Sequence, residues 1–213
     1  MIFYRPTDGD VHSAQIRWRP RTCFLMYAMG KGAAAEVTRA RKRVVESLKR
    51  AKYSTIDALS ETTGKDYLLK VWSQAVSAPV GIAIVHEGIR AETMANIFYE
   101  LGWMQAYGRE TVVIRIGDVK LPSDLVRSEY IPFDRAFTTR FSAFVSSLDQ
   151  RADYYLTLAD QLEKNPLLAI DYLRRSYLLS GDSRLKARAT KVFNESGLAE
   201  RAKDSVERNL ARF

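Results

Sequence analysis

Three short apolar runs, each followed by a glycine, constrain the fold of this chain more than any other feature. The runs are 22–28, 79–85 and 111–116, and the glycines are Gly30, Gly88 and Gly117. Runs of this length that end at glycine turns are typical of strands buried on both faces of a sheet. Helical patterns accompany them at 33–52, 66–77 and 91–107. This alternation predicts an α/β fold with a mostly parallel sheet and helices on both faces.

Weaker patterns complete the predicted organisation. Short strands are expected at 53–59 and at 130–131, the second as an edge strand. From Asp134 onward the pattern contains no strand candidate and is helical in period, with breaks at glycine and proline. The stretch 154–180 resembles a single tetratricopeptide-type helical hairpin. The predicted parts are an N-terminal arm at 1–21, an α/β domain at 22–148 and a C-terminal all-helical module at 149–213.

Composition narrows the class of protein. The 213 residues are 46% hydrophobic and 27% charged, which excludes a wholly disordered chain. Cys23 is the single cysteine, so no intrachain disulfide can form and a reducing compartment is expected. The sequence shows neither a signal-peptide pattern at its start nor an apolar run of the roughly 20 residues that span a bilayer. We therefore expect a cytoplasmic protein that does not enter the membrane.

The strand ends are the first candidate site, because open parallel sheets bind ligands at the carboxyl ends of their strands. Gly30 and Lys31 follow the first strand, and His86 and Glu87 follow the central one. Glycines let a ligand approach the backbone, and a lysine beside them can meet a phosphate. A histidine at this edge can bind ribose hydroxyls or supply a proton. The alternative is that these residues only form strand-to-helix turns.

The helix at 91–107 is the second candidate. Its charged residues are Glu92 and Glu100, and most of the others are apolar, so we expect it to be buried on most of its circumference. Asn96 and Glu100 are four residues apart and share one side of the helix. A buried carboxylate must be partnered or face a polar pocket, and desolvation raises its pKa toward the range of acid-base and nucleophilic work. The alternative is a structural carboxylate neutralised by an arginine or by backbone groups.

A family resemblance centres on the same helix. The residues Asn96-Ile-Phe-Tyr99-Glu100-Leu-Gly102, with Ala106-Tyr-Gly108 after them, resemble the N-x-x-Y-E-L-G…A-x-G-K motif. That motif marks bacterial TIR-like nucleotide-binding domains and the related nucleoside 2-deoxyribosyltransferase-like proteins, and the resemblance covers roughly 22–133. It implies a flavodoxin-like fold in which Glu100 is the catalytic carboxylate, with Asn96 and Tyr99 beside it. Such domains often carry a D-x-S-type loop after the first strands, whereas here Asp57 is the one nearby acid.

The resemblance implies cleavage or transfer at the N-glycosidic bond of NAD or of a nucleoside or nucleotide, in bacteria frequently as an effector in antiphage defence. The nucleotide would be substrate, with no separate cofactor. One carboxylate beside an anomeric carbon stabilises the oxocarbenium-like centre that such cleavage creates. Nicotinamide leaves NAD without a proton, whereas the base of a nucleoside needs a general acid. The alternative is a non-catalytic nucleotide sensor that signals through its helical tail.

Partners are less constrained by the sequence. The helical module is expected to mediate homo-oligomerisation or contact with a protein partner. The net charge of +8 permits a nucleic-acid partner without requiring one. Arg17-Trp18-Arg19-Pro20-Arg21 mixes cations with an aromatic ring, as single-strand binders do, but a solvated arm is favoured. No metal site is expected, because His12, Cys23 and His86 lack the spacing of a ligand set.

Overall fold

The computed structural model of the chain describes residues 4, 8–9, 16–29, 34–59, 67–121, 130–162 and 164–197. The chain forms two compact units. The sheet unit comprises Thr22–Ser146, and the helical unit combines Met1–Arg21 with Ser147–Phe213. None of the helices in the described ranges has the length and hydropathy needed to cross a membrane.

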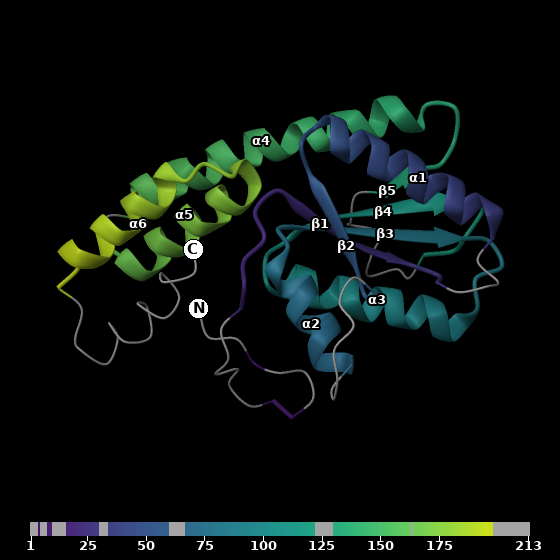
Figure 1. Ribbon diagram of the computed structural model, residues 1–213, viewed down its shortest axis with the longest axis horizontal. Coiled ribbons are helices and arrows are strands. Elements are labelled where there is room, and N and C mark those ends of the chain that lie inside the picture. Colours follow the sequence, from purple (N-terminus) through teal and green to yellow (C-terminus); the bar gives the residue numbers. More distant parts are fainter. Residues whose placement is uncertain are drawn as a thin grey trace. The chain divides into compact units, whose positions relative to one another are not determined.

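The sheet unit is built on a parallel sheet (Figure 1). Its strands are β1 (Thr22–Tyr27), β2 (Ser54–Asp57), β3 (Val80–His86), β4 (Glu110–Ile116) and β5 (Tyr130–Pro132). Their order is β2-β1-β3-β4-β5, and all neighbouring strands pair in parallel. The predicted α/β class is confirmed, and this strand order is that of a flavodoxin-like fold. The strand order reverses between β1 and β3, which makes that gap the topological switch point.

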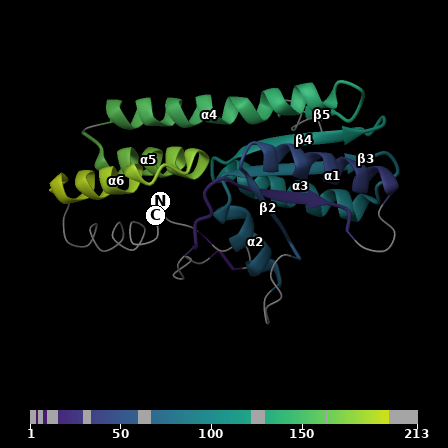
Figure 2. The ribbon, with the colours of Figure 1, turned by 45° about the horizontal axis from the view of Figure 1, so that its top comes forward.

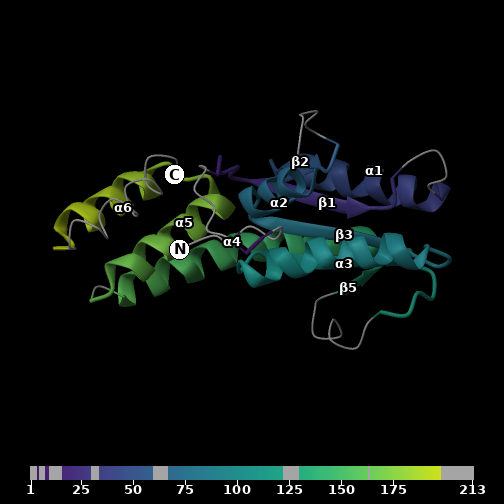
Figure 3. The ribbon, with the colours of Figure 1, turned by 90° about the horizontal axis from the view of Figure 1, so that it is seen from below.

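Helices cover both faces of the sheet. These are α1 (Ala35–Arg50), α2 (Tyr67–Ser77) and α3 (Ala91–Ala106). Figures 1 and 3 show α1 on one face and α2 and α3 on the other. The amphipathic pattern of α1 explains its place, because its buried side chains, Val37, Ala40, Val44 and Leu48, recur at helical spacing. We refer to the two sides of the sheet as the α1 face and the α2/α3 face.

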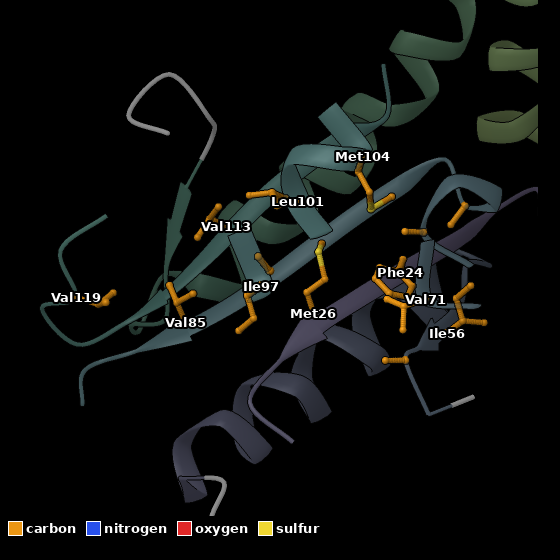
Figure 4. Close-up of a cluster of buried hydrophobic side chains, with 14 residues drawn as sticks. Phe24, Met26, Ile56, Val71, Val85, Ile97, Leu101, Met104, Val113 and Val119 are labelled. Atoms are coloured by element: carbon orange, nitrogen blue, oxygen red, sulfur yellow. The ribbon is translucent and has the colours of Figure 1, made fainter. Parts of the chain in front are cut away.

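Side chains that alternate along the strands separate the two faces. Phe24 and Met26 of β1 and Val85 of β3 point toward α2 and α3, where they form the cluster drawn in Figure 4. Because successive strand residues point to opposite sides, Tyr27 and Asp57 must point toward the α1 face. Gly81 of β3 lets α3 approach closely, since an added Cβ would lie 2.5 Å from the sulfur of Met104.

The predicted burial of α3 is wrong. Only Ile97, Leu101 and Met104 are buried, and the Tyr99 side chain is 51% exposed. The apolar and aromatic residues of α3 exceed what one sheet face and one neighbouring helix can cover. Composition alone overestimated the burial, because an apolar residue on a helix is buried only where another element covers it.

The helical unit contains the C-terminal end of α4 (Phe137–Gln161), which begins in the sheet unit, together with α5 (Pro166–Ser180) and α6 (Arg184–Glu195). Local signals explain the bounds of α5. Asn165 accepts a hydrogen bond from the Leu168 N–H, and Gly181 adopts the left-handed conformation that ends the helix. Figure 2 shows α5 beside α6, with which it packs.

Residues 16–21 belong to the helical unit rather than to a separate arm. The Arg21 N–H donates to the Leu178 carbonyl oxygen (2.8 Å). Trp18 is only 8% exposed, and the Arg174 guanidinium lies over its ring at 4.6 Å. The expectation of a solvated arm is therefore wrong at Trp18, because α5 supplies a cation that the indole face attracts. A buried Trp18 is also unable to stack on a nucleic-acid base.

Candidate functional site

Glu100 lies in a seam between α2 and α3. Viewed down the axis of α3, Glu100 lies about 60° from Ile97, at the edge of the buried side of the helix. Tyr107 falls on the same side, and its ring meets the ring of Trp72 of α2, with 6.1 Å between centroids. This contact identifies the α2-facing side of α3. We call the site formed by Tyr67, Trp72, Glu100 and Tyr107 the α2–α3 seam.

The Glu100 carboxyl is half-buried. Burial raises its pKa from 4.5 to about 7. Among the described residues none donates a hydrogen bond to this carboxyl or forms an ion pair with it. Desolvation disfavours the charged form and no cation in the described part of the chain opposes it, so the group is divided between acid and carboxylate near neutral pH. A carboxyl in this state suits proton transfer or stabilisation of a cationic centre.

Tyr67, the first residue of α2, is a member of the seam that sequence reasoning missed. Burial raises the pKa of its phenol, and the negative charges of Glu100 and Asp57 raise it further. The hydroxyl therefore lies within electrostatic range of Glu100 and remains a proton donor at neutral pH. No motif marks this tyrosine, because its relation to Glu100 depends on how α2 packs beside α3.

Asp57 pairs with residues of the α1 face. The Tyr27 hydroxyl donates to Asp57 Oδ2 (2.9 Å), and Arg41 Nη2 lies 3.6 Å from the same oxygen. Burial, followed by this hydrogen bond, raises the pKa of Tyr27 to about 12. The carboxylate thus has a phenol and a guanidinium as partners. Because Asp57 points toward α1, the structure does not bring it together with Glu100, which lies on a helix of the opposite face.

His86 and Glu87 lie at the carboxyl end of β3, as the sequence predicts. His86 Nδ1 donates to the Glu87 carbonyl oxygen (2.7 Å), and the Glu87 carboxylate accepts from the Asp118 N–H (3.4 Å). Gly117, at φ 72°, makes room, since an added Cβ would lie 2.8 Å from Glu87 Oε2. Glu100 lies nine residues into α3, roughly 14 Å along the helix axis from its start. One reacting carbon cannot therefore contact both His86 and Glu100.

The remaining predicted site residues lie elsewhere. Asn96 and Tyr99 are exposed, and the Tyr99 ring packs on Trp103 with 4.4 Å between centroids. Gly30 and Lys31 fall outside the described residues. Within the described ranges no three histidine, cysteine or acidic side chains gather as a metal site would require. Glu100 and Tyr67 are thus the seam residues whose pKa values are raised, and His86 and Glu87 form a separate group at the sheet edge.

The strand order and the seam together define a flavodoxin-like parallel α/β domain in which a carboxyl with a raised pKa lies between two helices of one face. A scan against protein-family models and a search of curated proteins both find no match to this chain.

Proposed function

We propose that the sheet unit cleaves or transfers at the N-glycosidic bond of NAD or of a nucleoside or nucleotide, with Glu100 as its catalytic carboxylate. The observation that carries this proposal is the half-buried Glu100 carboxyl, whose pKa is raised to about 7 and which has no cationic partner among the described residues. The resemblance of the residues around Glu100 to the TIR-like and deoxyribosyltransferase-like motif supports the same assignment.

Under this proposal, Glu100 acts in its ionised form in the transition state. Loss of the base leaves an oxocarbenium-like carbon, which a carboxylate stabilises by its charge or captures covalently. Nicotinamide leaves NAD without a proton, so turnover of NAD is expected to rise with pH through about 7 as Glu100 ionises. A nucleoside base needs a proton, and the Tyr67 phenol is a donor on the same seam. The pH profile therefore separates the two substrate classes.

Product analysis tests the proposal. Purified protein is incubated with NAD and with a panel of nucleosides and nucleotides, and released nicotinamide or free base is quantified. We expect Glu100→Gln to lower turnover by about 10²-fold or more, because it removes the charge without changing the shape. Glu92→Gln is the matched control, since Glu92 is exposed in the first turn of the same helix. Turnover that survives Glu100→Gln would contradict the proposal.

The separation of His86 from Glu100 favours a second candidate, a nucleotide sensor without catalysis. A ligand at the switch point would contact His86 and Glu87 at the end of β3 and leave Glu100 untouched. Under this candidate, nucleotide binding survives Glu100→Gln and is lost in His86→Ala, and no product forms. Isothermal titration calorimetry of both variants distinguishes the sensor from the enzyme. Product release that depends on Glu100 would exclude the sensor.

A further inference from the structure

A groove of the sheet unit lies on the α1 face, away from the α2–α3 seam. It is a groove of about 880 Å³ between α1 and the segment that follows β5, and it opens at the ends of β4 and β5. The residues that line it include Ile116, Gly117, Arg43 and Phe133. This volume lies within the range of small-molecule sites, and the carboxyl ends of strands are where open parallel sheets bind ligands. We call it the α1 groove.

Positive charges outnumber negative charges in the α1 groove when the carboxylates that already pair with an arginine are set aside. Its cations are Arg39, Lys42, Arg43 and Arg135, and its carboxylates are Glu36, Glu46 and Asp134. Arg39 Nη2 lies 3.0 Å from Glu36 Oε1, so these two charges offset each other. Asp134 accepts from Arg140 (2.8 Å) and from the Ala136 N–H (2.9 Å), contacts that hold the pKa of its carboxyl below the usual value. Among the described residues that line the groove, this leaves the cations Lys42, Arg43 and Arg135 and the carboxylate of Glu46.

An aromatic ring stands beside these cations. Phe133 is fixed by its backbone N–H, which donates to the Arg115 carbonyl oxygen (2.8 Å), and by an edge contact with Phe137, with 4.9 Å between centroids. The Arg43 guanidinium lies 5.8 Å from the Phe133 ring centroid. A guanidinium can pair with phosphate oxygens through two parallel hydrogen bonds, and a flat aromatic surface beside it suits a planar base.

We propose that the α1 groove binds a phosphorylated small molecule of nucleotide size. Lys42, Arg43 and Arg135 contact its phosphate oxygens, and Phe133 lies against its base. The site is independent of the proposed function, because the α1 groove and the α2–α3 seam are on opposite faces of the sheet. The net charge of +8 favours the approach of such an anion.

Calorimetric titration of the whole chain with pyrophosphate, AMP and ATP at constant ionic strength tests the proposal. We expect ATP to bind more tightly than AMP, and Arg43→Gln and Arg135→Gln each to weaken ATP binding by about 10-fold, since each removes a charged hydrogen bond. Arg50→Gln is the control, because Arg50 is exposed in the last turn of α1 outside the groove. Unchanged melting temperatures show that the exposed substitutions leave the fold intact, and Arg43→Lys should restore part of the affinity.

Four results would overturn the proposal. They are no binding of any probe at millimolar concentration, equal weakening by Arg50→Gln, unchanged ATP affinity in both groove variants, and binding of a DNA oligonucleotide without binding of ATP. Glu100→Gln is titrated in parallel and should leave ATP affinity at the groove unchanged. Loss of product release in Glu100→Gln with intact ATP binding would support both proposals. Loss of ATP binding in the groove variants with normal product release would support the groove independently of turnover.

Discussion

Both units of the protein bury a carboxyl group, but only one of them neutralises it. In the helical unit, Asp171 lies between two arginines of its own helix, pairing with Arg174 and with Arg175 Nε at 2.9 Å. Burial alone would raise its pKa, but the two guanidinium groups outweigh burial and lower it. In the sheet unit, burial raises the pKa of Glu100 and no described cation opposes that shift.

This difference separates a structural carboxylate from a candidate catalytic one. Arg174 also lies over Trp18, so the Asp171 network joins residues 16–21 to α5 and serves the fold. Glu100 supports no comparable contact, and its ionised form costs the folded state free energy. Natural proteins retain such costs mainly at functional sites.

The largest expected effect on stability is that of Asp171→Asn. The substitution leaves the buried Arg174 guanidinium without its counter-charge, which should lower the free energy of unfolding by about 3–5 kcal/mol. For a chain of this size the midpoint of thermal unfolding should then fall by roughly 10 °C. Asp153→Asn, at an exposed position of α4, is the control and should leave the midpoint unchanged. If Asp171→Asn leaves the midpoint of thermal unfolding unchanged, the network does not stabilise the helical unit.

Glu100→Gln should raise the free energy of unfolding, whereas Asp171→Asn lowers it, and the size of the increase should depend on pH. The pKa is about 7 in the folded state and 4.5 in the reference state, so folding favours the protonated form and wild-type stability falls as pH rises between these values. At pH 8 the variant should be more stable than the wild type by about 1–3 kcal/mol, and near pH 4 the difference should vanish. Urea unfolding at pH 4, 6 and 8 measures this. A variant less stable than the wild type at pH 8 would indicate that a partner neutralises Glu100.

Asp57→Asn should have the smallest of the three effects on stability. It also tests whether the α1 face contributes to turnover. It weakens the contacts with Tyr27 and Arg41, which should lower the free energy of unfolding by about 1–2 kcal/mol. Product release should stay within about 3-fold of wild type, because no positioned group of the seam is removed. A loss as large as that of Glu100→Gln would show that Asp57 contributes to substrate binding, the role that the sequence prediction gives it.

The fold was predictable because its strongest signals are local. Buried runs such as 79–85 contain enough apolar residues to identify central strands, and Gly88 and Gly117 mark where those strands end. The sequence also singles out Glu100, because it is the carboxylate in the middle of a mostly apolar helix, and its catalytic role stays a prediction. The bounds of α5 follow from Asn165, Pro166 and Gly181, which act within a few residues of themselves.

The grouping of the site residues was not predictable, because it depends on contacts distant in sequence. Asp57 pairs with Tyr27 and Arg41 only because parallel pairing places β2 beside β1 under α1. Tyr67 comes near Glu100 through the packing of α2 against α3, which no spacing encodes. The burial of Trp18 could not be predicted for the same reason, because it depends on Arg174, which lies far along the chain.

Direct titration of the Glu100 carboxyl tests the central claim most closely. In protein labelled with ¹³C at the glutamate side-chain carboxyls, the Glu100 signal is assigned by its absence from Glu100→Gln and followed from pH 4 to pH 9. We expect a midpoint near 7, because the half-buried carboxyl has no cationic partner in the described part of the chain. A midpoint at or below 4.5 would show that Glu100 is neutralised like Asp171 and is a structural group.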